Sequence, residues 1–144
     1  EATSRTGELA AIRRADVDLD AGTVWIHGTP RTAARLGSLT PWGMSQLTRR
    51  LPTLDEDPET LVVGGTKPGS ALAQSSSVGL LLQALTRAGL GQTSGVRPSS
   101  IAAWAGRRVF DETGRIDLAA NRLGLRSLDR TARFIGWDWS DDLG

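Results

Sequence analysis

Arginine is the residue type of this sequence best suited to bind a charged ligand, because it carries almost all of the positive charge. The chain contains 17 lysine and arginine residues, and Lys67 is the only lysine. A guanidinium binds phosphate through a planar fork of N–H donors, whereas an ammonium acts as a point charge. The composition therefore suits phosphate contacts. A GC-rich coding sequence gives the same bias and is the simpler explanation of it.

The missing residue types exclude several kinds of chemistry. The sequence has no cysteine, which excludes disulfides, thiolate metal sites and cysteine nucleophiles. It has no tyrosine and a single histidine, His27, so a tyrosine nucleophile and any mechanism with two histidines are excluded. A lone histidine makes no metal site, and we expect His27 to pack at a strand end. We expect no metal and no cofactor.

The charges are unevenly distributed along the sequence, although the net charge of the 144-residue chain is only +1. Acidic residues gather at 55–59 and at 138–142, where we expect solubilising surface. Arginines exceed acidic residues between positions 97 and 133. The chain as a whole is therefore not a general polyanion binder, and any anion site must be local.

The length of 144 residues predicts a single domain with a sizeable core. No apolar run approaches the ~18 residues that a membrane span needs, and no signal peptide is visible at the start. With no export signal and no disulfides, we expect a cytoplasmic location.

The element pattern predicts an α+β fold that is mainly helical, with a small antiparallel β-sheet packed on a helical body. In the first half we expect strands at 16–19, 23–27 and 36–40, a helix at 41–51, a short buried strand at 61–63 and a loop at 67–77. In the second half we expect helices at 77–88, 98–113, 117–123 and 127–135, the second and third ended by glycines. The five tryptophans are expected to supply much of the core.

Five segments follow one another in an order that matches the motifs of a known family. They are Arg5-Thr6-Gly7-Glu8-Leu9, the hairpin at 28–41, Pro98-Ser99-Ser100-Ile101-Ala102-Ala103-Trp104, Leu123-Gly124-Leu125-Arg126-Ser127-Leu128 and Arg130-Thr131-Ala132-Arg133-Phe134. In this order they resemble the catalytic domain of the tyrosine recombinases, the phage integrase family. The resemblance implies that 1–144 is one such C-terminal domain. It also implies that the first helix or helices and an N-terminal DNA-clamping domain are missing, since a helix looks already under way at Arg5.

The resemblance implies the family's DNA strand cleavage, and it also implies that this chain has lost that activity. In the family a tyrosine attacks a DNA phosphate, two arginines hold that phosphate, and a lysine and histidine-type residues move protons. Carried over by position, these roles fall on Arg5, Arg31, Ser99, Ala102, Leu125 and Phe134. Phe134 lacks a nucleophilic hydroxyl, and Arg31 is a very poor general acid. The resemblance therefore implies a pseudoenzyme, a recombinase fold without strand cleavage and with no catalytic residue assigned.

The hypothesis that follows is a domain that binds double-stranded DNA without cutting it, as a mobile-element remnant or a retained regulator. The residues expected to contact DNA are Arg5, Arg31, Arg35, Arg97, Ser99, Arg107 and Arg108. Each has a simpler alternative. Arg5 would pair with Glu8 at helical spacing, Ser99 would be an ordinary helix cap, and the other arginines would be solvated.

Two further functions stay open at this point. One is a protein-interaction module, in which the segment 137–144 docks on another copy of the chain or on an active recombinase. The other, which we favour least, is an active recombinase that uses a different nucleophile. For an inactive domain we expect Phe134 to be buried where the nucleophile lies in the family.

Overall fold

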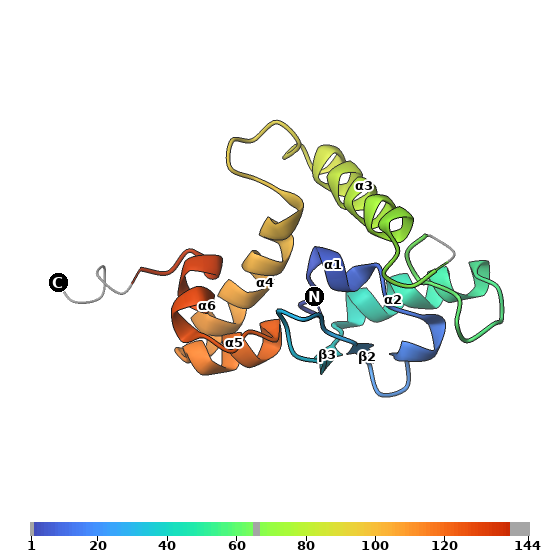
Figure 1. Ribbon diagram of the computed structural model, residues 1–144, viewed down its shortest axis with the longest axis horizontal. Helices are drawn as coiled ribbons and strands as arrows, with labels where there is room; N and C mark the ends of the chain where they lie inside the picture. Colours follow the sequence, from blue (N-terminus) through green and yellow to red (C-terminus); the bar gives the residue numbers. More distant parts are fainter. Residues whose placement is uncertain (1, 65–66, 139–144) are drawn as a thin grey trace.

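The molecule consists of a sheet-containing first part and a helical second part that lie against each other (Figure 1). The computed structural model describes residues 2–64 and 67–138. The first part comprises α1 (Thr6–Leu9), η1 (Arg14–Asp16), β1 (Val17–Asp18), β2 (Thr23–Ile26), β3 (Arg35–Ser38), α2 (Pro41–Arg50), η2 (Leu51–Thr53) and α3 (Ala71–Arg87). The second comprises α4 (Pro98–Thr113), α5 (Ile116–Leu123) and α6 (Leu128–Ile135). The predicted fold class is confirmed.

The three strands form one antiparallel sheet in the order β1-β2-β3. Successive residues of β2 point to opposite faces, so Val24 and Ile26 are buried while Trp25, paired with Leu36 of β3, faces outward. Val24 packs with Ile12 and Val62 in a core cluster beneath the sheet. The predicted three-stranded hairpin arrangement is confirmed, with strands shorter than expected.

Two expectations about the first part are wrong. Leu61 and Val62 are buried and Val63 is partly buried, but Leu61 makes only an isolated bridge with Arg13 and no strand forms. No helix is under way at Arg5 either, because residues 2–5 are not helical and α1 begins at Thr6.

Helix α3 begins earlier than its composition predicts, so the expected loop at 67–77 is wrong from Ala71 onward. Ser70 caps the helix by accepting a hydrogen bond from the Ala73 backbone N–H at 3.2 Å. Ala73 and Ser77 are completely buried, and α3 packs against α1. The serines of this segment have a weaker helix preference than its alanines, and the small size of both residue types allows this close packing.

The second part is a three-helix unit whose core is built from small and aliphatic residues. Ala102, Leu123 and Ile135 form the cluster where α4, α5 and α6 meet. Gly106 permits the approach of α5 to α4, since a Cβ there would lie 2.5 Å from Cδ1 of Leu123. The helices end at Gly114 and Gly124 as predicted. No helix in the described parts of the chain is both long and apolar enough to cross a membrane.

The tryptophans do not supply the core, which corrects the prediction made from composition. Trp25, Trp42 and Trp104 are 42%, 67% and 58% exposed. Trp137 packs on Phe110 with ring centroids 4.4 Å apart, and Trp139 lies outside the described residues. The buried faces of β2 and α4 are filled by valine, isoleucine and alanine instead, which turns Trp25 and Trp104 outward.

Candidate functional site

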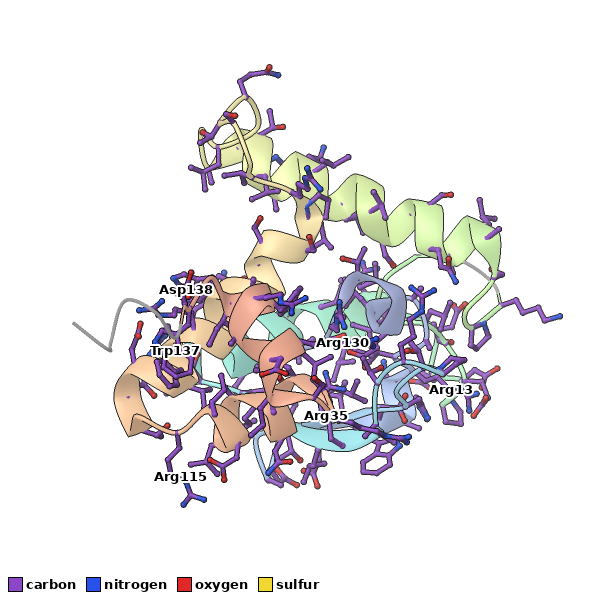
Figure 2. The ribbon with its side chains drawn as sticks, turned by 60° about the vertical axis from the view of Figure 1, so that its left-hand side comes forward. Arg13, Arg35, Arg115, Arg130, Trp137 and Asp138 are labelled. Atoms are coloured by element: carbon purple, nitrogen blue, oxygen red, sulfur yellow. The ribbon has the colours of Figure 1, made fainter. Side chains whose placement is uncertain are left out.

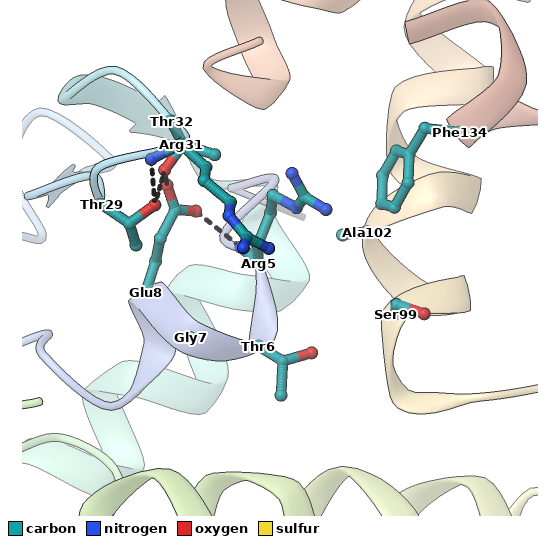
Figure 3. A pocket seen from close by; sticks show the side chains of 10 residues that line it. All are labelled: Arg5, Thr6, Gly7, Glu8, Thr29, Arg31, Thr32, Ser99, Ala102 and Phe134. Carbon is teal, nitrogen blue, oxygen red and sulfur yellow. Dashed lines mark hydrogen bonds between the residues drawn. The ribbon is translucent and has the colours of Figure 1, made fainter. Parts of the chain in front are cut away.

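A concavity of about 340 Å³ opens where the two parts of the molecule meet (Figure 3). Its lining residues come from α1, the β2–β3 loop, α4 and α6, and are Arg5, Thr6, Gly7, Glu8, Thr29, Arg31, Thr32, Ser99, Ala102 and Phe134. Five of the six positions that the family resemblance singles out therefore line one pocket. The sixth, Leu125, packs against the core of the second part instead.

The loop between β2 and β3 carries Arg31 to the rim of this pocket. Gly28 adopts a φ of +74°, and a Cβ there would lie 2.6 Å from the carbonyl oxygen of Thr32. The backbone N–H groups of Thr29 and Thr32 each donate to the other residue's carbonyl, at 3.0 and 3.1 Å. The tight loop thus leaves the Arg31 side chain exposed at its tip.

Glu8 is the one carboxylate on the pocket wall within the described residues, and its charge is already compensated. It is 1% exposed and accepts hydrogen bonds from Arg35, from the Thr32 hydroxyl at 2.6 Å and from the Arg5 backbone N–H at 2.7 Å. Burial alone would raise the pKa of Glu8, but these hydrogen bonds outweigh it and hold the pKa below its ordinary value. Glu8 is therefore an ionised structural group.

Arg35 is the partner of Glu8, and its guanidinium has no donor left for a ligand. Its Nη1 and Nη2 atoms donate to the two carboxylate oxygens at 2.7 and 2.9 Å. The remaining donors reach the carbonyl oxygens of Arg122, Ala33 and Thr3 at 2.7, 3.0 and 2.8 Å. All five N–H donors are thus engaged. Figure 2 shows Arg35 where the sheet meets the helical part. Because its donors are engaged within the chain, we do not include Arg35 among the proposed DNA contacts.

Arg5 does not form the expected side-chain pair with Glu8. Its guanidinium lies over the ring of Phe134, with Cζ 4.6 Å from the ring centroid. Within residues 2–64 and 67–138, no carboxylate forms an ion pair with Arg5 or Arg31. The pocket therefore carries two guanidinium charges that no neighbouring acid offsets.

The start of α4 forms the opposite wall of the pocket. Ser99 is exposed there and lines the pocket together with Ala102. The capping hydrogen bond is made by the next residue, because the Ser100 hydroxyl oxygen accepts from the Arg97 backbone N–H at 3.0 Å. Ser99 is thus free of the ordinary capping role that was its alternative, and it lines the wall across from the arginines with its hydroxyl oxygen pointing away from them (Figure 3).

Besides Arg35, three more of the predicted DNA contacts lie away from the pocket. Arg107 and Arg108 of α4 pair with Asp111 and Glu112 at 2.7 and 2.8 Å, each one helical turn further along. Arg97 is exposed at the N-cap of α4 but does not line the concavity. The structure thus gathers Arg5, Arg31 and Ser99 and separates them from the other candidates.

Sequence reasoning missed two of the threonines that line the pocket, Thr29 and Thr32. Thr29 and Thr32 place their hydroxyl oxygens 2.9 Å apart at the base of the loop, and Thr32 links the loop to Glu8. The Gly28-Thr29-Pro30 turn signal pointed to this loop but not to the hydroxyl groups inside it.

Comparison with known proteins identifies a fold and no closer relationship. No protein-family model matches the chain, and no curated protein matches it. The crystal structure of XerA recombinase superimposes with a TM-score of 0.74 and 18% sequence identity. The match covers 96% of this chain and 50% of the XerA chain, so this chain spans about half the length of that protein. The domain therefore has a recombinase-like fold.

Proposed function

We propose that this domain binds double-stranded DNA by its phosphate backbone at the pocket of Arg5, Arg31 and Ser99. The observation that carries the proposal is the convergence of two unpaired guanidinium groups from distant segments on one open concavity. The only carboxylate on its wall within the described residues is neutralised by Arg35. Arginine forks in such a setting bind phosphate oxygens bidentately.

We further propose that the domain does not cut the DNA that it binds. Phe134 occupies the pocket wall where the resemblance places the tyrosine, and the chain contains no tyrosine at all. Ala102 stands where a second phosphate-holding arginine is implied, so a pentavalent phosphate would lack its second clamp. A nicked duplex that traps covalent adducts should yield none on a denaturing gel, and an adduct would contradict this half of the proposal.

Binding of this kind depends strongly on salt and weakly on sequence. Each neutralised phosphate contributes a slope of about −0.9 to log K against log salt concentration. Two or three contacts at the pocket predict a total slope of about −2 to −3. The affinity should therefore be modest and best measured at low ionic strength.

Fluorescence anisotropy of a labelled duplex tests the proposal with matched arginine variants. Arg5→Ala and Arg31→Ala should each weaken binding about tenfold and reduce the salt slope by about 1. Arg49→Ala is the control, because Arg49 is exposed at the end of α2 and does not line the pocket. No binding by the unmodified chain, or equal losses in all three variants, would contradict the proposal.

An apolar groove favours a second candidate function, a protein-interaction module. The groove has a volume of about 480 Å³, and its wall includes Trp42, Leu81 and Ile101 from three different helices.

The C-terminal segment 137–144 is the part of the chain proposed to dock on another copy, and a truncation tests this. Trp137 already packs on Phe110, so a truncation after Asp138 removes the rest of the segment without removing that contact. Light scattering of both forms tests the hypothesis. A lower mass for the truncated form supports tail-mediated assembly, and identical masses argue against it.

A further inference from the structure

We infer that Phe134 is a positioning residue for phosphate binding, because its ring fixes the guanidinium of Arg5 inside the pocket. The inference rests on the proposed function and adds a role for the residue that stands in the nucleophile position. Phe134 belongs to α6 and Arg5 precedes α1, so the contact joins the two walls of the pocket (Figure 3).

The main chain of Arg5 is already anchored, while its side chain depends on the ring. The backbone N–H of Arg5 donates to Oε2 of Glu8 at 2.7 Å, which fixes where the side chain begins. Beyond that point, the guanidinium lies over the ring of Phe134, with Cζ 4.6 Å from the ring centroid. The ring therefore determines where the charge lies.

The ring is itself supported by the core of the second part, although Phe134 is half-buried and not fully buried as expected. Phe134 packs against the cluster of Ala102, Leu123 and Ile135, and the neighbouring Ala132 and Ile135 of α6 are 1% and 6% exposed. A guanidinium resting on a fixed aromatic face loses its rotamer freedom before the ligand arrives, rather than on binding. The face contact consumes no N–H donor, so the planar fork stays available to a phosphate.

A second positive charge on the same wall of the pocket makes this restraint useful (Figure 3). Arg31 contributes a second guanidinium to the same concavity, and like charges repel. Without the ring, Arg5 would be free to swing away from Arg31 toward solvent. The aromatic face attracts the cation through its quadrupole and keeps both forks directed at one site.

A double-mutant cycle on DNA binding tests the inference. Phe134→Leu keeps an apolar side chain but removes the aromatic face, and should weaken duplex binding about three- to tenfold with an unchanged salt slope. Phe134→Tyr retains the ring and should bind like the unmodified chain. In the Arg5→Ala background, Phe134→Leu should have no further effect, because the cation that it positions is gone.

The second phenylalanine provides a matched control. Phe110 lies 5.9 Å from the guanidinium of Arg107 and packs on Trp137, away from the pocket. Phe110→Leu should lower the melting temperature without changing DNA affinity. Equal affinity of Phe134→Leu and the unmodified chain, or the same loss in the Arg5→Ala background, would overturn the inference while leaving DNA binding intact. Absence of binding by the unmodified chain would overturn the proposed function itself.

Discussion

Glu8 determines which arginines of this domain remain available for a ligand. It is buried and engages both outer nitrogens of Arg35, so that arginine becomes part of the core. Arg5 is left with only its backbone bound to the same carboxylate, and its side chain is released to the pocket. One carboxylate thus separates a structural arginine from a candidate phosphate ligand.

Removal of the Glu8 charge should strongly destabilise the fold. Glu8→Gln leaves the guanidinium of Arg35 buried without a counter-charge, which typically costs about 3–5 kcal/mol. Glu112→Gln is the control, because Glu112 pairs with Arg108 on the surface at 2.8 Å and such pairs contribute about 0–1 kcal/mol. Urea denaturation of both variants measures the difference. A loss in Glu8→Gln no larger than in the control would contradict this role.

The lowered pKa of Glu8 predicts how stability depends on pH. A carboxyl whose pKa is lower in the folded chain stabilises the fold at pH values above its unfolded pKa. The loss begins when the pH falls below the unfolded pKa of a glutamate, about 4.3. It is complete once the pH has passed below the lower folded pKa. The unfolding free energy of the unmodified chain should therefore fall more steeply on acidification than that of Glu8→Gln. Parallel pH profiles from denaturation series would refute the assignment.

The order of the motifs predicted that Arg5, Arg31, Ser99 and Phe134 lie close together, and all four line one pocket. This was possible because the order of motifs along the sequence indicates the topology of the fold. The pairing of Arg35 with the buried Glu8 was not predictable. Nothing in the local sequence distinguishes Arg35 from Arg31, and the difference arises only when the hairpin meets Glu8 and the carbonyl group of Arg122.

At the scale of elements, the β2–β3 hairpin forms hydrogen bonds that connect the two halves of the molecule. The Ala33 backbone N–H donates to the Gly124 carbonyl at 2.9 Å, and Nη1 of Arg122 donates to the Ser38 hydroxyl at 2.8 Å. These bonds orient the loop that carries Arg31. The end of α5 is therefore coupled to the geometry of the pocket.

Gly124 is the residue that makes this junction possible. A Cβ at Gly124 would lie 2.5 Å from Nη1 of Arg35 and 2.8 Å from the Ala33 carbonyl oxygen, in addition to the strain of a φ of +67°. Gly114 has a similar φ of +65° but open space around it. Gly114→Ala should therefore cost only the left-handed strain, about 1–2 kcal/mol, and Gly124→Ala clearly more. Thermal denaturation compares the two, and equal costs would show that the close approach is not needed.

Element boundaries were predictable where the backbone chemistry is local. The glycines that end α4 and α5 and the Thr40-Pro41 start of α2 all matched. The start of α3 and the exposure of the tryptophans were not predictable, because they depend on which small residues the neighbouring elements bury. Ala73 and Ser77 illustrate this, since both are completely buried in a helix that packs against α1, and the local sequence does not indicate that burial.

At the scale of the whole molecule, the pocket exists only because the two parts meet. The first part contributes Arg5 and the loop of Arg31, and the second contributes Ser99 and Phe134. The net charge of +1 gives little general attraction to DNA, so binding must arise from this local arrangement. Most of the surface should remain free when DNA binds.

Amide NMR shifts of the isotope-labelled chain, followed while a short duplex is added at low salt, test this account most directly. We expect the largest shifts around Arg5, at 29–32 and at the start of α4. Small shifts are expected at the exposed Arg49 and at Arg115, which Figure 2 shows. We also expect the shifts to disappear as salt is raised. Shifts concentrated away from the pocket, or no shifts at all, would contradict the central claim.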